Sequence, residues 1–165
     1  MAISPANLTE AMASWAGAVG LLTIADGRDD VGATVSALCP VSQEPPLVMV
    51  SLMASSYPAE VLGSLARSFA VTLLASDQRM LAGRFAAEGR PAARHLLADV
   101  SHSRGSESGA LIPSNGLAAL ECVVEQLVPA GDHLLVLARV LAVPYTTESG
   151  TPLIRFRHRY PTVLG

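Results

Sequence analysis

The sequence predicts a mainly β fold with short helices, and three of its features support that prediction. Half of the 165 residues are hydrophobic and only 15% are charged, which is enough apolar material for one well-packed core. About six apolar segments of strand length recur along the chain, separated by turns that contain Gly, Pro or Asp. Antiparallel strands that close into a barrel leave no exposed sheet edge. We therefore expect a single domain over residues 1–165, built as a closed antiparallel barrel.

The first half of the chain is predicted to hold a short helix followed by three strands. Asn7 or Thr9 is a suitable N-cap for the helix, which is expected to end near Gly17. The apolar segments that follow are separated by an Asp-Gly turn and by a proline-rich loop. The predicted strands cover residues 18–25, 31–38 and 47–53. The last strand, LVMVSLM, is apolar almost throughout, so it is expected to be buried on both faces.

The second half is predicted to alternate short helices with four strands. A helix is expected from Pro58, because proline suits a first helical turn, and Asp77 is expected to cap a second helix over residues 77–88. Met80, Leu81, Phe85 and Ala86 are predicted to lie on or near one apolar stripe of that second helix. A helical turn within residues 90–98 and a mobile Ser/Gly-rich loop at 101–109 follow. The strands of this half are predicted at residues 69–75, 117–127, 132–143 and 151–157.

The composition excludes several kinds of chemistry. All eleven cationic side chains are arginines, so neither a lysine Schiff base nor a Walker-type phosphate loop is available. The net charge of −3 gives no reason to expect a nucleic-acid partner. Cys39 and Cys122 are expected to be reduced thiols. Together with the four scattered histidines they show no metal-ligand spacing, so no metal site is expected.

The apolar run at residues 11–25 is expected to be a helix followed by a strand. No cation precedes it, because the first is Arg28, and fifteen residues are fewer than the ~20 that an ordinary membrane span needs. We therefore expect a cytoplasmic protein without a membrane partner. The low charge fraction leaves apolar surface to be covered, which favours a large interface between two copies of the chain.

Six segments in a fixed order carry a resemblance to a known family. They are GATVSAL (32–38), EPPLVMVSL (44–52), SFAVTLLASDQRMLAGRFA (68–86), LECVV (120–124), GDHLLVLARV (131–140) and PLIRFRHRY (152–160). In this order the chain resembles the short-chain flavin reductases, from about Gly17 to Tyr160. The resemblance implies a Greek-key, FMN-binding split β-barrel and a homodimer. It also implies an NAD(P)H:flavin oxidoreductase that uses NADH or NADPH to reduce FMN or FAD, and that supplies reduced flavin to a separate flavin-dependent monooxygenase.

Two other functions remain open at this point. A split-barrel protein that retains its flavin could act directly on an organic substrate. A non-catalytic flavin-binding protein is the other alternative, because the expected phosphate-binding loop lacks a cation. Direct hydride transfer between nicotinamide and flavin needs no protein nucleophile, so a chain without a nucleophile–base motif is compatible with all three.

The resemblance implies flavin contacts along two strands. The stretch Thr34, Val35, Ser36 and Ala37 would contact the flavin ring, and Thr34 and Ser36 are expected on the same side of their strand. The residues that would hold ribityl and phosphate oxygens are Ser51, Leu52, Ser55 and Ser56. The alternatives are an ordinary half-buried strand and a plain polar loop. Relatives often have an arginine in this loop, whereas this chain has Ala54 and Pro58.

The missing cation is expected from elsewhere in the chain. Arg84 is our candidate, because its helix, which also contains Phe85, packs toward the flavin in the family. Three further arginines alternate on the last predicted strand and are expected to share one face, where they would suit a phosphate or only guard a sheet edge. These are Arg155, Arg157 and Arg159, followed by Tyr160, which matches a family tyrosine near the flavin.

His133 is the predicted catalytic residue. It matches the histidine of the family's GDH motif, which lies near the nicotinamide and the flavin, and an imidazole there can hydrogen-bond either ring. Without the resemblance, a lone histidine at a strand start would more often be structural. Asp132 is expected to shape the turn. His95 and His102 are expected at the surface.

Overall fold

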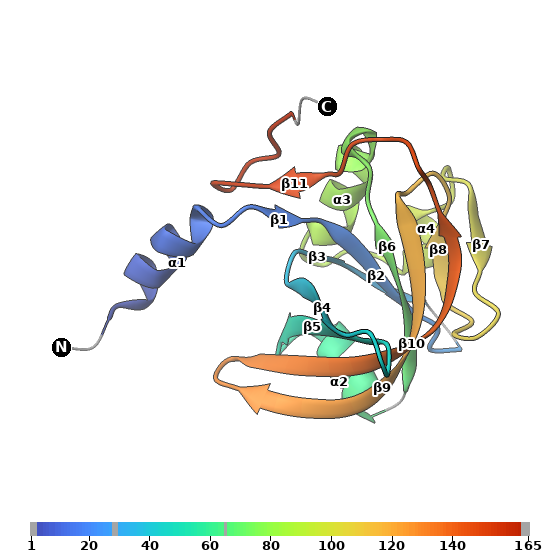
Figure 1. The fold of residues 1–165 in the computed structure, drawn as a ribbon, viewed down its shortest axis with the longest axis horizontal. Helices are drawn as coiled ribbons and strands as arrows, with labels where there is room; N and C mark the ends of the chain where they lie inside the picture. The colour runs from blue at the N-terminus through green and yellow to red at the C-terminus, as the bar shows by residue number, and fades with distance from the viewer. Residues whose placement is uncertain (1–2, 28–29, 65, 163–165) are drawn as a thin grey trace.

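The computed structural model describes residues 3–27, 30–64 and 66–162, and its centre is a seven-stranded antiparallel sheet (Figure 1). The order of strands across the sheet is β3-β2-β6-β9-β10-β5-β4. These strands are β2 (Gly20–Ile24), β3 (Val31–Val35), β4 (Leu38–Ser42), β5 (Leu47–Met53), β6 (Ser68–Leu73), β9 (Ala118–Ala130) and β10 (His133–Thr146). The prediction of a mainly β, antiparallel fold with short helices is confirmed, with seven strands in this sheet instead of about six.

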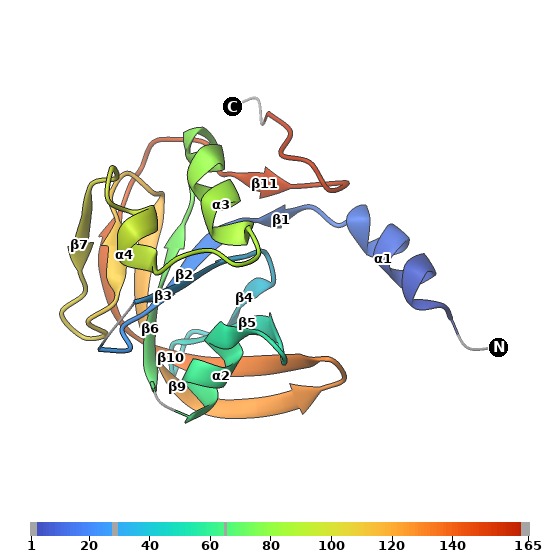
Figure 2. The ribbon, with the colours of Figure 1, turned by 180° about the vertical axis from the view of Figure 1, so that it is seen from behind.

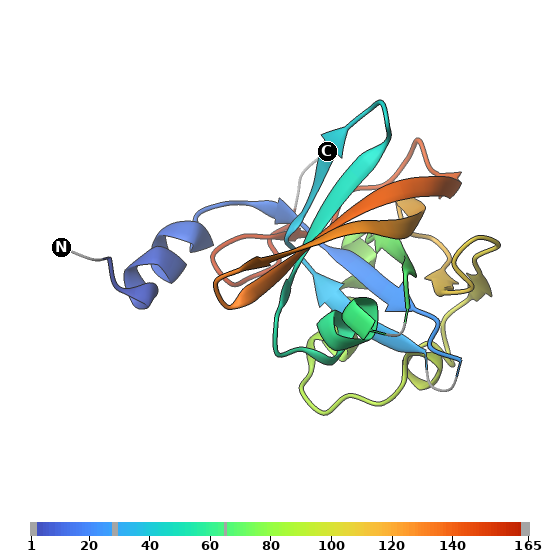
Figure 3. The same ribbon diagram turned by 90° about the horizontal axis from the view of Figure 1, so that it is seen from below.

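The two edge strands of this sheet are consecutive in the chain. β3 and β4 lie at opposite ends of the strand order, yet only Ser36 and Ala37 separate them. The connection is anchored to β5, because the Ser51 N–H donates to the Ala37 carbonyl at 2.9 Å. The sheet must therefore curve until its two edges approach each other at this connection. Figure 3 shows the β4–β5 pair beside β10, as the β5–β10 pairing requires.

The strand predictions differ from the structure in burial and in one boundary. β5 alternates, with Val48, Val50 and Leu52 in the core and the side chains between them facing outward, so the expectation of burial on both faces is wrong. The last predicted strand is also too long, because β11 covers only Ile154–Arg155 and pairs with β1 (Gly17–Ala18).

A tight turn follows β11 and separates the three C-terminal arginines. Phe156 and Arg159 exchange two backbone hydrogen bonds of 2.9 Å, and the two residues between them have φ values of +48° and +61°. Two consecutive left-handed residues reverse the chain. Arg155, Arg157 and Arg159 therefore do not share one strand face, and that prediction is wrong.

The helices are short, and α1 (Pro5–Ala13) stands apart from the sheet (Figures 1 and 2). Its N-cap is Ser4, whose Oγ accepts the Asn7 N–H at 3.2 Å, so neither Asn7 nor Thr9 caps it. No residue of α1 is buried. The remaining helices are α2 (Tyr57–Ser64), the 3-10 turn η1 (Ser76–Gln78), α3 (Arg79–Ala86) and α4 (Ala93–Leu96). None of the helices in the described ranges is long and apolar enough to cross a membrane.

The helix α3 covers the outer side of β3, and its buried stripe differs from the prediction. Leu81, Ala82 and Phe85 are buried, while Met80 is 76% exposed and Ala86 is also exposed. Asp77 lies inside η1 and does not cap the helix, which begins two residues later, so that part of the prediction is wrong as well. The Phe85 ring lies so close to Gly32 that a Cβ there would meet the ring at 2.4 Å.

The hairpin formed by β7 (His102–Arg104) and β8 (Leu111–Pro113) occupies the region predicted to be a mobile loop. The chain between these strands folds around Glu121, whose Oε1 accepts the N–H groups of Glu107 (3.1 Å) and Ser108 (2.8 Å). The Ser108 hydroxyl also donates to it at 2.7 Å. This buried carboxylate therefore ties the loop to β9, and part of the region expected to be a loop is the strand β7.

Both cysteines are free thiols, in agreement with the prediction. Cys122 is fully buried in β9, and burial, helped by the neighbouring Glu121 charge, raises the pKa of its thiol to about 12. Cys39 lies half-buried on the edge strand β4. The thiol of Cys122 is therefore protonated and unreactive at neutral pH.

Candidate functional site

A cavity of about 680 Å³ lies between α1, the β3–β4 connection and the C-terminal turn. Its volume is in the range of sites for small molecules and cofactors. Its lining comes from segments far apart in the sequence: Leu8, Thr9, Met12, Ala13, Trp15, Gly17, Ser36, Ala37, Ser51, His133, Arg155, Arg157 and His158. We refer to it below as the α1 cavity.

One wall of the α1 cavity is built from the β3–β4 connection and β5. Ser36 and Ala37 form the connection, and Ser51 lies beside them through its hydrogen bond to the Ala37 carbonyl. Gly17 approaches this wall closely, since a Cβ on it would lie 3.3 Å from the Ser36 carbonyl oxygen. This wall offers two hydroxyl groups and main-chain polar groups to a ligand.

His133 is the first residue of β10 and follows a tight turn at Gly131, whose φ of +64° favours glycine. Its Nδ1 lies 2.7 Å from the Asp132 carboxylate. Because a carboxylate only accepts, Nδ1 carries the hydrogen and Nε2 remains available to a ligand. The hydrogen bond and the charge of His133 lower the pKa of Asp132. The Asp132 carbonyl also accepts the Ala54 N–H at 2.9 Å, which ties the turn to the end of β5.

The cationic side of the α1 cavity consists of Arg155 and Arg157, with His158 beside them. Within the described residues, neither arginine has a carboxylate partner. The Arg157 guanidinium lies over the Phe156 ring, 5.2 Å from its centroid. The Arg157 backbone N–H donates to the Ala13 carbonyl at 2.7 Å, so this turn is joined to the end of α1. Two unpaired guanidinium groups provide donors for an anionic ligand.

The structure brings only part of the predicted site together. The predicted residues that line the α1 cavity are Ser36, Ala37, Ser51, His133 and Arg157. Thr34 points to the other side, where its hydroxyl donates to the Ala82 carbonyl at 2.6 Å and joins β3 to α3. Val35 and Leu52 are buried core residues. Thr34 and Ser36 therefore have different surroundings, because β3 ends at Val35 and the chain turns there.

Four further predicted residues lie outside the α1 cavity. Ser55 and Ser56 precede α2, and Ser56 Oγ accepts the Ala59 N–H at 3.4 Å, in the manner of a helix cap. Phe85 is buried against Gly32. Tyr160 packs on the α3 side, where the Arg79 guanidinium lies 5.5 Å from its ring centroid.

Arg84 is occupied by an ion pair. Its two terminal nitrogens bind the two Asp99 carboxylate oxygens at 2.5 and 2.8 Å, and one of them also donates to the Leu96 carbonyl. The hydrogen bonds and the charge of Asp99 raise the pKa of Arg84, and Arg84 lowers that of Asp99. Arg84 therefore joins α3 to the segment after α4, and the structure does not place it with the serines as a phosphate-binding cation.

Sequence reasoning missed the contribution of α1 to this site, whereas Arg155 was among the three arginines considered for a phosphate. Leu8, Met12 and Trp15 line the cavity from the helix side. Their spacing of four and three residues is helical, so this apolar stripe was visible in the sequence, although α1 itself ends at Ala13 and Trp15 follows it. What the sequence did not show is that the stripe faces a cavity, because the helix could equally have packed on the sheet.

An open cavity that combines hydroxyl groups, an imidazole and arginines without a carboxylate partner among the described residues is suited in its chemistry to an anionic organic ligand. The flavin reductase like domain matches residues 12–164, so the chain belongs to that family.

Curated relatives cover most of the chain. The NADH-dependent FMN reductase AsuE2 of Streptomyces nodosus subsp. asukaensis is 31% identical over 88% of this chain and 77% of its own. The actinorhodin polyketide dimerase of Streptomyces coelicolor is 34% identical, over 97% and 87%. The reductase component of 4-hydroxyphenylacetate 3-monooxygenase of Thermus thermophilus is 32% identical, over 92% and 91%.

A solved structure agrees with this assignment. The bacterial protein BorF, described as the flavin reductase component of a two-component tryptophan halogenase, superposes with a TM-score of 0.88. The two chains are 25% identical, and the superposition covers 96% of this chain and 97% of BorF. The resemblance stated from the sequence is therefore confirmed at the level of the family and of the fold.

Proposed function

We propose that the protein is an NADH:flavin oxidoreductase that reduces FMN or FAD and releases the reduced flavin to a separate monooxygenase. The observation that carries the proposal is the α1 cavity in a chain of this family: it brings together His133, the serine hydroxyls and two arginines that have no carboxylate partner among the described residues. The relatives named as an NADH-dependent FMN reductase and as a monooxygenase reductase component support it. NADPH would be the donor instead if a further cation were available for its 2′-phosphate.

The donor groups of the cavity fit a flavin and a nicotinamide. A bound flavin would supply the hydride acceptor and a bound reduced nicotinamide the hydride, with the proton coming from solvent. The hydroxyl groups of Ser36 and Ser51 and the main chain between β3 and β4 are suited to the polar edge of a flavin ring. Arg155 and Arg157 are suited to phosphate groups because no described carboxylate neutralises them.

We assign His133 the role of orienting the reacting rings. The Asp132 carboxylate accepts the Nδ1–H of His133, so the imidazole presents Nε2 in a fixed direction at the start of β10. A hydrogen bond from or to Nε2 would position a carboxamide or a flavin carbonyl. The site assignment is therefore Ser36, Ala37, Ser51, His133, Arg155 and Arg157, and Arg84 is not part of it.

We further propose that residues 1–165 fold as one domain and act in the cytoplasm as a homodimer. The outward side chains of β5 and β10 form an apolar surface, in which Met49 lies opposite Leu137. Leu141 and Val143 continue this surface and are 45% and 53% exposed. Ser51 belongs to β5 and His133 to β10, and both line the cavity. A second copy covering this surface would therefore lie next to the cavity.

Steady-state turnover tests the reaction. Purified protein is mixed with NADH and either FMN or FAD as the only acceptor, and NADH absorbance is followed without any oxygenase component. We expect multiple turnovers per protein molecule. Oxidation of no more NADH than the protein present would contradict release of reduced flavin. Light scattering tests the assembly, with about twice the 17.1 kDa chain mass expected.

A second candidate function is direct action on an organic substrate. The observation in its favour is that the 34% identical relative is named as a polyketide dimerase, not as a reductase. In that case NADH consumption with free flavin alone would be slow, and an added aromatic substrate would be converted. Turnover with free flavin alone and turnover with an added aromatic substrate therefore separate the two candidates. Absence of turnover in both assays would leave a non-catalytic flavin-binding protein.

A further inference from the structure

We infer that Trp15 is a stacking residue of the α1 cavity, where its indole covers one face of the flat heteroaromatic ring that enters. The inference rests on the proposed function, since the ring is that of the flavin or of the nicotinamide. Trp15 is the only tryptophan of the chain; it lines the cavity and is 74% exposed. An indole is a large apolar plane, and a planar ligand would remove much of it from water.

The backbone around Trp15 is anchored on both sides. Just before it, the Ala13 carbonyl accepts the Arg157 N–H at 2.7 Å, and the Trp15 N–H itself donates to the Met12 carbonyl at 3.0 Å. Just after it, Gly17 pairs with Arg155 in the two-stranded β1–β11 sheet (Figure 2). Trp15 is therefore held between two fixed points at the edge of the cavity, and is not part of a free terminus.

The surroundings of Trp15 divide the cavity into an apolar and a polar wall. Leu8 and Met12, on one face of α1, precede it in the chain, line the cavity and are 52% and 53% exposed. Ser51 and His133 belong to the wall formed by the sheet. A ligand between these walls needs an apolar face and a hydrogen-bonding edge, which is the character of a flat heteroaromatic ring.

The charges next to Trp15 identify the ligand class more closely. Arg155 lies opposite Gly17 in the β1–β11 pairing, and Arg157 is joined to the end of α1. An aromatic plane beside two guanidinium groups that meet no carboxylate in the described part of the chain suits a molecule that carries both a ring and phosphate groups. Flavin and nicotinamide nucleotides share this chemistry. A second copy of the chain packing on the indole is the rival, and the experiment distinguishes it.

The first test uses the fluorescence of the wild-type protein, because all tryptophan emission comes from Trp15. Oxidised NAD⁺, FMN and riboflavin are titrated separately. NAD⁺ does not absorb where tryptophan emits, so quenching by NAD⁺ requires contact between the rings. Saturable quenching by NAD⁺ assigns the nicotinamide nucleotide to Trp15. Flavins absorb where tryptophan emits and also quench by energy transfer, so the flavin ring is assigned only if Trp15→Ala also raises the dissociation constant of FMN and of riboflavin, measured from flavin fluorescence. No saturable quenching by any of the three, at concentrations that support turnover, overturns the inference.

The second test compares Trp15→Ala and Trp15→Phe with Met80→Ala, which removes an exposed apolar side chain of α3 outside the cavity. We expect Trp15→Ala to raise the KM of the stacked ligand about tenfold, with a smaller change in kcat, because stacking on an aromatic ring contributes binding energy. Trp15→Phe should retain most of the wild-type KM, and Met80→Ala should leave it unchanged.

Each outcome has a defined meaning. Wild-type turnover with an unchanged KM in Trp15→Ala overturns the stacking role and leaves the proposed function intact. Absence of turnover in the wild type overturns the proposed function, while the NAD⁺ and FMN titrations still decide on stacking. If Trp15→Ala halves the mass measured by light scattering and Trp15→Phe restores it, the indole packs on a second copy and the inference is wrong.

Discussion

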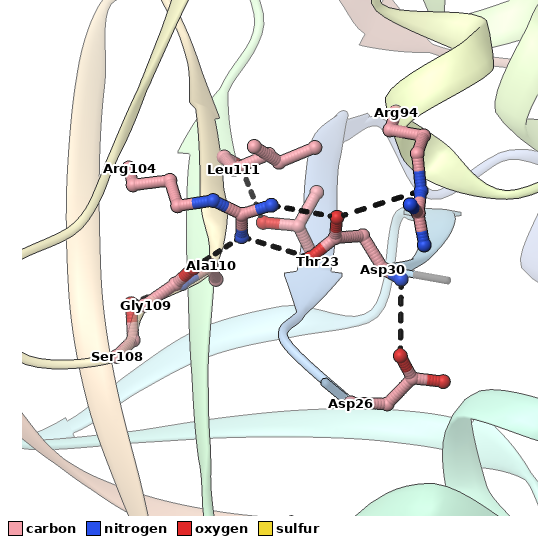
Figure 4. A network of polar contacts seen from close by, with 9 residues as sticks. All are labelled: Thr23, Asp26, Asp30, Arg94, Arg104, Ser108, Gly109, Ala110 and Leu111. Atoms are coloured by element: carbon pink, nitrogen blue, oxygen red, sulfur yellow. Dashed lines mark hydrogen bonds and ion pairs between the residues drawn. The ribbon is translucent and has the colours of Figure 1, made fainter. Parts of the chain in front are cut away.

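Two groups of arginines in this protein have opposite environments. Arg104 forms two hydrogen bonds, of 2.9 and 2.8 Å, with the Asp30 carboxylate, and Arg94 lies 4.0 Å from the same group (Figure 4). The Asp30 side chain is only 7% exposed. By contrast, Arg155 and Arg157 line a cavity and meet no carboxylate in the part of the chain that the structure describes.

The difference shows how one residue type serves two purposes. At Asp30 the guanidinium groups connect the β2–β3 turn to the β7–β8 hairpin and to α4, since Arg104 also donates to the Gly109 carbonyl at 2.8 Å. Their donors are used inside the protein. In the α1 cavity the donors remain available for a ligand. We therefore expect changes at Asp30 to affect folding, and changes at the cavity arginines to affect binding.

The largest effect is expected for Asp30→Asn, which breaks the structural group. Asparagine tolerates the positive φ of +50° at this position but removes the charge that Arg104 and Arg94 face. Breaking a buried pair costs ~3–5 kcal/mol, and the partial exposure of both arginines reduces this, so we expect a loss of about 3 kcal/mol in the free energy of unfolding. Chemical denaturation measures it. Arg155→Ala is the control and should change this free energy by less than about 0.5 kcal/mol.

The second largest effect is expected for Glu121→Gln in the same region. Burial acts to raise the pKa of Glu121, but the hydrogen bonds from Ser108 and its neighbours outweigh it, and the pKa is lowered. Removing the charge should cost about 2 kcal/mol, because hydrogen bonds to a charged group are lost.

The pH dependence of stability gives this prediction its direction. A lowered native pKa means that the carboxylate of Glu121 stabilises the fold fully above the ordinary glutamate pKa, and that this contribution is lost as the pH falls through the native pKa. Glu121→Gln should therefore differ most from wild type at neutral pH and approach it in acid. Equal differences at neutral and acidic pH would contradict the role of the charge.

A smaller effect, on binding instead of folding, is expected for Arg157→Gln. If Arg157 binds a phosphate, the preference for FMN over riboflavin should shrink by about 1.5 kcal/mol, measured as the ratio of the two dissociation constants. Arg84→Gln is the matched control, since Arg84 is already paired with Asp99 and should leave the ratio unchanged. If Arg84→Gln lowered the preference for FMN and Arg157→Gln did not, the division between ligand-binding and structural arginines would be wrong.

The smallest effect is expected for His133→Ala. Loss of an orienting hydrogen bond should lower kcat/KM for NADH about tenfold, which corresponds to about 1.4 kcal/mol, with little change in flavin affinity. The imidazole is 41% exposed, so the fold should persist. The exposed His102 provides the control as His102→Ala. Unfolding of the His133 variant would favour a structural histidine.

The sequence predicted the strands better than the partners of single side chains. Apolar runs such as residues 69–75 and 132–143 mark strands because a half-buried pleated surface imposes that composition. The direction of a side chain needs tertiary information. Arg84 and Arg157 look alike in the sequence. In the structure Arg84 pairs with Asp99, fifteen residues away, whereas Arg157 lines the α1 cavity.

Local backbone geometry explains other errors. Alternating arginines predicted a strand up to Arg157, but left-handed φ values at Arg157 and His158 reverse the chain there.

The Ser/Gly-rich loop was expected to be mobile because its composition is typical of linkers. In the structure a buried carboxylate of β9, Glu121, accepts hydrogen bonds from this loop, and no local pattern in the sequence reveals those contacts.

The two-residue connection between β3 and β4 has a mechanical consequence. Ser36 and Ala37 are at once a wall of the α1 cavity and the link between the two edges of the main sheet. A ligand that restrains them also limits how far those edges can separate during local opening. Ligand binding should therefore slow amide hydrogen exchange along β3 and β4, including positions that the ligand never touches.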